Sequence, residues 1–271
     1  MKKSLLTSLL AITLLSLTAC GDTTSNDGLS VEDILKESIS TMEELDSYTL
    51  AMDMSQVIEE ENEESELESI NFDYTYDIAL TLEPTTMEMV IRADMGELGN
   101  GEYLVYLTED DGFYIKEPTA TTWLKMSDDF SDGLMTMTEI QRNPENLLKS
   151  FEENLTYLSV ETTDSSYIIS LDSGDLNKEE ILDQFEDLGF DDMSPLNEMD
   201  MDIENISHKV TIDKETFYQT EIDIEMTFNM TIMGEISSID QQLHMVLSNF
   251  NNTDPIQIPE DVLEEAEELD F

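Results

Sequence analysis

Basic residues, histidine and cysteine are scarce in this chain of 271 residues. It has 11 lysines and arginines against 64 aspartates and glutamates, which gives a formal net charge of -53. A surface of that charge repels nucleic-acid phosphates and anionic lipid headgroups. We therefore exclude nucleic acid as a partner. The two histidines, His208 and His244, have no second nitrogen or sulfur ligand near them in the sequence, so we expect no zinc site.

Recognisable catalytic and cofactor motifs are also missing. There is no Gly-x-Ser-x-Gly, no P-loop and no nucleophile beside a plausible base. Carboxylates are dense at 172–180 and 191–202, but neither segment has the Asp-x-Asp-x-Asp-Gly order of a calcium loop. Solvated acidic loops are the favoured interpretation over calcium. We expect no enzyme, no cofactor and no metal.

The single cysteine, Cys20, follows a short apolar stretch that begins behind Lys2 and Lys3. This is the basic and then apolar order of a secretory signal peptide, and the stretch is shorter than the roughly 20 apolar residues that span a bilayer. Leu17, Thr18 and Ala19 before Cys20 resemble the lipobox of bacterial lipoproteins. The resemblance implies cleavage after Ala19 and lipidation of Cys20. The alternative is an ordinary secreted protein with one unpaired thiol.

These features predict three segments: a signal peptide at 1–19, a lipid-anchored linker at 20–29 and a single folded domain at 30–271. Two acyl chains on Cys20 would give stable attachment to the extracytoplasmic face of the cell membrane. The linker is polar, and as a flexible coil it spans only about 15 Å. We expect a monomer that works close to the membrane surface.

Hydrophobic periodicity then predicts the elements of the domain. Ser30 is a helix cap, followed by apolar residues at helical spacing up to Leu45. Further helices are expected at 132–141, from Pro144, at 177–189 with Asn177 as its cap, and at 260–269. Period-two alternation predicts strands at 48–55, 70–82, 87–95, 103–108, 113–116, 122–126, 155–161, 167–171, 206–213, 218–232 and 239–247.

This element order predicts an α+β fold. Long strands with one continuous apolar face need a cover, and the helices are the available one. We expect a strongly curved antiparallel sheet, a half-barrel of about ten or eleven strands, with three or four helices packed on its concave side. The space between sheet and helices is the natural ligand cavity.

The chain resembles the LolA/LppX-like lipoproteins of low-GC Gram-positive bacteria. The resemblance is carried by the lipobox and by the segments at 45–49, 113–116, 123–125, 212–216 and 258–262. It implies a half-barrel closed by helices, whose apolar cavity carries lipids or the acyl chains of lipoproteins. None of these segments is catalytic, and many members have no assigned activity.

We therefore expect a membrane-anchored binding protein for an apolar ligand, an acyl chain or a lipid. The expected wall of its site is Met52, Met54, Phe72, Tyr74, Met89, Trp123, Met226, Phe228, Met230 and Met245. Methionine suits adaptable apolar sites, but the many methionines can equally fill an irregular core, and thioether copper binding is a third interpretation. The alternative function is a cell-envelope interaction domain with a fully packed core, no ligand and a protein partner.

Overall fold

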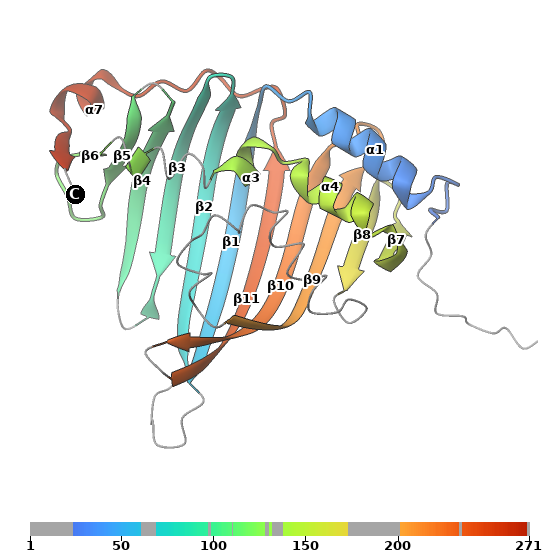
Figure 1. The fold of residues 1–271 in the computed structure, drawn as a ribbon. Helices are drawn as coiled ribbons and strands as arrows, with labels where there is room; N and C mark the ends of the chain where they lie inside the picture. Colours follow the sequence, from blue (N-terminus) through green and yellow to red (C-terminus); the bar gives the residue numbers. More distant parts are fainter. Residues whose placement is uncertain are drawn as a thin grey trace, which may run out of the picture.

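Twelve strands form one open sheet in this computed structural model (Figure 1), which describes residues 24–60, 69–96, 99–109, 111–127, 130–131, 138–172, 201–232 and 235–269. The strands are β1 Ser47–Glu60, β2 Ile70–Leu82, β3 Thr85–Asp94, β4 Asn100–Thr108, β5 Gly112–Lys116, β6 Leu124–Met126, β7 Leu158–Thr162, β8 Ser166–Asp172, β9 Met201–Asp213, β10 Gln219–Ile232, β11 Glu235–Ser248 and β12 Glu267–Leu269. The helices are α1 Val31–Met42, α3 Glu139–Arg142, α4 Asn146–Glu153 and α7 Glu260–Glu265, with a 3₁₀ turn at Leu155–Tyr157.

The strand order is β12-β6-β5-β4-β3-β2-β1-β11-β10-β9-β8-β7. Two runs of sequential neighbours, β1 to β6 and β7 to β11, are joined where β1 pairs with β11. That pairing is antiparallel from Thr49 opposite Ser248 to Glu60 opposite Ser237. The first strand of the domain thus lies in the middle of the sheet, and strands far apart in the sequence form one surface.

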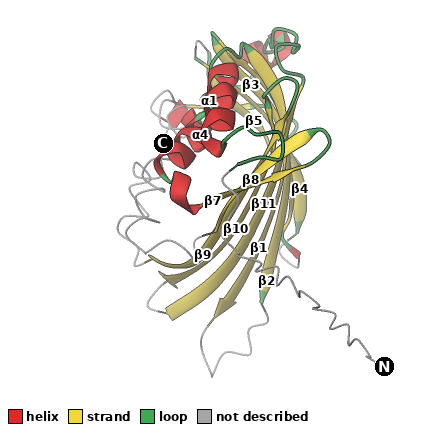
Figure 2. Cartoon of the chain, turned by 90° about the vertical axis from the view of Figure 1, so that its right-hand side faces the viewer, coloured by secondary structure: helices red, strands yellow, loops and turns green. Residues whose placement is uncertain are grey.

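The expected fold class is wrong in four respects. The sheet has twelve strands rather than ten or eleven, and it is mixed, because β12 pairs with β6 in parallel. The structure is mostly sheet, with short helices. The helices α1 and α4 lie over the β7 to β10 end of the sheet and do not cover its whole face (Figures 1 and 2).

Alternation along the strands gives the sheet two chemically different faces. Successive side chains of a strand point to opposite sides. On β1, Leu50 is buried and Asp53 is exposed, and on β2 Ile78 is buried and Asp77 is exposed. We call the side that α1 and α4 contact the inner face and the opposite side the outer face.

The helix α1 begins as its sequence predicts. Ser30 Oγ accepts a hydrogen bond from the Asp33 backbone N–H (3.1 Å), and the Asp33 carboxylate accepts one from the Ser30 backbone N–H (3.3 Å). This capping box satisfies two backbone donors that helix geometry leaves free. The helix ends at Met42, earlier than the predicted Leu45.

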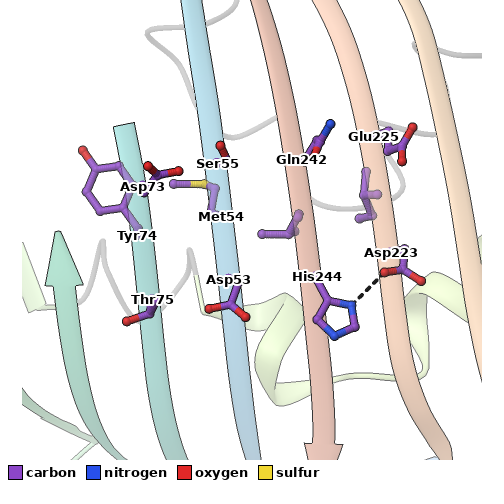
Figure 3. Close-up of a pocket in the computed structure, with 12 residues that line it drawn as sticks. Asp53, Met54, Ser55, Asp73, Tyr74, Thr75, Asp223, Glu225, Gln242 and His244 are labelled. Atoms are coloured by element: carbon purple, nitrogen blue, oxygen red, sulfur yellow. Dashed lines mark hydrogen bonds and ion pairs between the residues drawn. The ribbon is translucent and has the colours of Figure 1, made fainter. Parts of the chain in front are cut away.

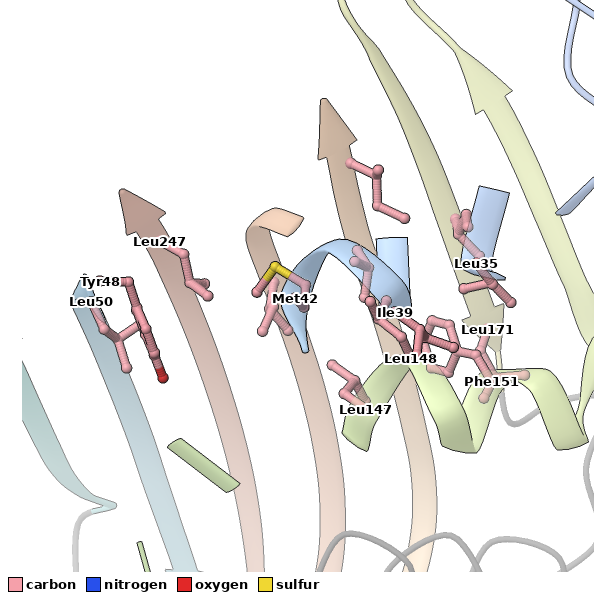
Figure 4. Packing of buried hydrophobic residues seen from close by; sticks show 14 of the residues in the cluster. Leu35, Ile39, Met42, Tyr48, Leu50, Leu147, Leu148, Phe151, Leu171 and Leu247 are labelled. Atoms are coloured by element: carbon pink, nitrogen blue, oxygen red, sulfur yellow. The ribbon is translucent and has the colours of Figure 1, made fainter. Parts of the chain in front are cut away.

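The core joins α1 and α4 to the inner face (Figure 4). Leu35 and Ile39 of α1 and Leu148 and Phe151 of α4 are buried against one another and against the sheet. Helix α4 begins at Asn146 rather than at the predicted Pro144, with Glu145 as its N-cap and no side-chain cap hydrogen bond. Apolar packing therefore holds this short helix in place more than capping does.

The side chain of His208 on β9 is polar and is buried inside this apolar packing. It is 2% exposed, its ring stacks on Phe151 of α4 (centroids 6.1 Å apart), and its Nε2 atom has no hydrogen-bond partner. Burial lowers the pKa of the imidazole to about 4.

The C-terminal segment crosses to the outer face. Helix α7 packs Val262 with Ile258 against Tyr114 of β5. The expected helix at 260–269 ends at Glu265, because the chain then extends and pairs with β6: the Glu267 N–H donates to the Trp123 carbonyl (2.9 Å).

Several expected features lie outside the described residues. They are the signal peptide, the lipobox and Cys20, the helix at 177–189, the acidic segments at 173–200, and most of the helix at 132–141.

Replacing Leu148 tests the helix packing. Leu148→Ala removes a fully buried side chain and leaves a cavity, so we expect a loss of about 2–5 kcal/mol in the free energy of unfolding. Urea unfolding followed by circular dichroism measures it. The matched control is Leu263→Ala on α7, a leucine that is 43% exposed and should change stability little. Equal losses in both variants would contradict the packing described here.

Acid should destabilise the fold through His208. Because the folded-state pKa is about 4 and the ordinary value is 6.5, the unfolded chain binds a proton between these pH values that the folded chain does not. This contribution to stability is present above pH 6.5 and is lost as the pH falls toward 4, by about 2 kcal/mol between pH 7 and pH 5. Subtracting the pH profile of His208→Phe from that of the wild type isolates the effect from carboxylate titration. Parallel profiles would show that His208 is not buried in its neutral form.

Candidate functional site

The inner face brings nine of the ten expected wall residues together. The pairings place Tyr74, Met54, Leu243, Ile224 and His208 directly opposite one another across β2, β1, β11, β10 and β9. A second row, two residues along each strand, is Tyr76, Met52, Met245, Ile222 and Val210. Because residues two apart on a strand share a face, Phe72, Met89, Met226, Phe228 and Met230 lie on this side as well.

Most of these side chains are partly buried rather than sealed in the core. Met52, Met54, Phe72, Tyr74, Met89, Met226, Met230 and Met245 are all of intermediate exposure, and Phe228 is buried. Ile70, at the end of the same face, is 40% exposed. The inner face thus continues beyond the helices as an apolar surface with some access.

The inner face is not uniformly apolar. Gln56 of β1 and Gln241 of β11 are directly opposite each other and lie between Phe72 and Met226 in a third row. Both are partly buried. The inner face therefore has hydrogen-bonding groups beside its methionines.

Trp123 does not belong to the wall. Its ring packs against Tyr106 (centroids 5.5 Å apart) with the cluster under α7, and the Lys116 ammonium lies 6.0 Å from the ring centre. Tyr106 and Tyr114 alternate with Leu107 and Phe113, which face inward, so this cluster lies on the outer face. Trp123 precedes β6, outside a regular strand, and alternation therefore could not assign its side.

Several residues in these rows were not among the expected wall residues, and Tyr76, Ile224 and Leu243 are examples. The signal for each was present, because Tyr76 alternates in register with Phe72 and Tyr74, and Ile224 with Met226. The strand pairing that sets them in rows with Met54 was not visible from one sequence.

A groove of about 320 Å³ crosses the outer face of β2, β1, β11 and β10 (Figure 3). Two rows of polar side chains border it, Thr75, Asp53, His244 and Asp223 in one and Asp73, Ser55, Gln242 and Glu225 in the other. His244 Nδ1 lies 2.7 Å from a carboxylate oxygen of Asp223. The groove is acidic and exposed, and sequence analysis did not anticipate it because its residues come from four strands.

The groove carboxylates do not form a metal centre. Within the described ranges, no group of three or more His, Cys, Asp or Glu side chains is arranged to hold a metal ion. None of the helices in the described part of the chain has the length and apolar character needed to cross a membrane.

Comparison with solved structures finds proteins of low similarity. A DUF1329 family protein from Desulfovibrio piger is 11% identical with a TM-score of 0.25, over 81% of this chain and 90% of that one. A LolA superfamily protein from Nitrosomonas europaea is 8% identical with a TM-score of 0.24, over 87% and 98%. A beta-barrel-like protein of the domain of unknown function DUF1849 from Brucella abortus is 10% identical with a TM-score of 0.21, over 75% and 98%. Likeness at these scores carries no argument about this chain.

Sequence comparison gives the family. No curated protein matches the chain. Residues 30–267, which include all but the last two residues of the described sheet, match the family described as "Family of unknown function (DUF6612)". The chain belongs to the DUF6612 family.

Proposed function

We propose that this protein is a lipid-anchored, extracytoplasmic binding protein that holds an apolar ligand, an acyl chain or a lipid, against the inner face of its sheet. The observation that supports the proposal is that the side chains of that face lie in rows across neighbouring strands. Methionine and aromatic side chains from β2, β1, β11 and β10 lie opposite one another and remain partly accessible beyond α1 and α4.

The composition of this surface favours an apolar ligand of variable shape. Methionine side chains are flexible and polarisable, so a wall built from them adapts to different chains. Burying apolar area contributes about 25 cal/mol per Å², before the cost of ordering the ligand. The strongly acidic chain also disfavours ligands that bind through negative charge. We propose binding rather than catalysis as the role of this surface.

Location follows from the sequence around Cys20. The lipobox Leu17-Thr18-Ala19-Cys20 supports anchoring at the outer side of the cell membrane. The described contacts begin at Thr24, which forms a β-bridge with Ser30. The carboxylate of Asp27 forms an ion pair with the ammonium of Lys214, with 2.7 Å between Oδ2 and Nζ. The proposed anchor would therefore hold the domain by the end of the sheet that carries β7 and β8.

If Cys20 is lipidated, the Cys20→Ser variant should differ from the wild type in fatty-acid labelling and in membrane association. We expect the wild-type chain, produced in a bacterium with lipoprotein processing, to incorporate a labelled fatty acid and to sediment with membranes. Cys20→Ser should incorporate none, because the thiol that accepts the diacylglyceryl group is gone. Thr18→Ser, which keeps the small residue of the lipobox, is the control and should be labelled normally. Labelling of Cys20→Ser would rule out this anchor.

Substitutions on the inner face should weaken ligand binding, and substitutions on the outer face should not. A chain that begins at residue 21 keeps all described contacts and can be titrated with a dansyl fatty acid without detergent. The double variant Met52→Gln/Met245→Gln changes two residues that face each other on the inner side, and should weaken binding about tenfold or more because amides replace apolar contact.

The matched control changes the neighbouring pair on the other side of the same strands. Ala51→Gln/Val246→Gln lies one residue away in each strand and faces outward, so the affinity should stay within about twofold of the wild type. Circular dichroism confirms that both variants fold. A wild type that ignores the probe, or equal losses in both variants, would favour the packed interaction domain instead.

A further inference from the structure

Among the described residues, the inner face carries a buried polar atom without a hydrogen-bond partner. His208 is 2% exposed, and its Nε2 atom makes no hydrogen bond. Buried polar atoms are nearly always paired, so an unpaired one needs a physical reason. An apolar residue of similar size at this position would avoid the desolvation cost of the ring nitrogen.

The position of His208 relates it to the proposed ligand. It lies in the row that runs from Leu171 on β8 through Ile224, Leu243 and Met54 to Tyr74. Four strand spacings separate His208 from Tyr74, which is roughly 19 Å. This row is therefore a largely apolar strip with one hydrogen-bonding atom in the part that α4 covers.

The surroundings of His208 determine what it can bind. In the described part of the chain, its strand partners are Leu171 on β8 and Ile224 on β10, and Phe151 of α4 stacks on its ring; none of these three is titratable. The next residue on its own strand, Lys209, is exposed and lies on the outer face. Burial alone lowers the pKa of the ring, so the imidazole is neutral at neutral pH and one of its nitrogens is a hydrogen-bond acceptor.

We propose that His208 Nε2 accepts a hydrogen bond from the hydroxyl of a single-chain amphiphile, a fatty alcohol or a fatty acid in its protonated form. The inference rests on the proposed function, since the chain of this ligand would lie along the Tyr74 to Ile224 strip. Its head group would reach His208 along the sheet beneath α4, because Phe151 covers the ring. An uncharged head also suits a protein that carries a formal charge of -53.

The test compares ligands that differ in one donor. The affinities of 1-dodecanol and its methyl ether are measured by displacement of the dansyl fatty acid from the chain that begins at residue 21. The alcohol should bind about tenfold more tightly than the ether, because the ether leaves Nε2 unpaired. In His208→Phe the two affinities should agree within about twofold, whereas His208→Gln, whose amide oxygen can accept the hydrogen bond, should retain part of the preference.

A second variant and a spectroscopic signal separate His208 from the other polar groups of the inner face. Gln241→Leu removes another polar group of that face and should keep the alcohol preference. In the wild type, the ¹⁵N resonance of His208 Nε2 should shift with the alcohol and not with the ether. Equal binding of both ligands to the wild type, or a preference lost in Gln241→Leu and kept in His208→Phe, overturns the role of His208 alone. Absence of binding by either ligand overturns the proposed function as well.

Discussion

The pairing of β1 with β11 is the constraint on which the rest of the structure depends. It joins two runs of strands into one sheet, and its register places Met52 opposite Met245 and Met54 opposite Leu243. Because the side-chain period of a strand is two, a slip of one residue would turn Asp53 and His244 inward and the methionines outward. The apolar inner face, the acidic outer face and the position of His208 all depend on that register.

Local patterns in the sequence predicted much of this arrangement. The cap at Ser30 and the alternation through 70–82 and 113–116 all have short-range physical causes, and the structure has an element at each. Alternation also assigned nine wall residues to one face. The remaining features depend on contacts between distant segments. The parallel addition of β12 to β6, the outward position of Trp123 and the outer groove each require pairing partners that a single sequence does not reveal. The expectation that helices cover the concave side of the sheet was wrong for a related reason. The length of a helix does not determine how much of a sheet the helix covers.

The two faces suggest a division of roles. The outer face exposes carboxylates, including Asp73 opposite Asp94, a like-charged pair that costs stability and favours solvent over a packed partner. Its ion pairs are largely exposed, such as Arg92 with Asp77 and Glu102, and contribute little to stability. The inner face concentrates the apolar area, and its short helix α4 is held by a few buried side chains above His208. The proposed ligand would contact the partly buried methionines and, beneath α4, the buried imidazole of His208.

Mass spectrometry of what the folded protein carries is the most direct measurement. The chain that begins at residue 21 would be purified in high salt without detergent, extracted with organic solvent and analysed for lipids. Binding at the inner face predicts a single-chain or acyl lipid in stoichiometric amount, reduced in Met52→Gln/Met245→Gln. A folded protein that carries no lipid and does not respond to fatty-acid probes would contradict a ligand site on this face.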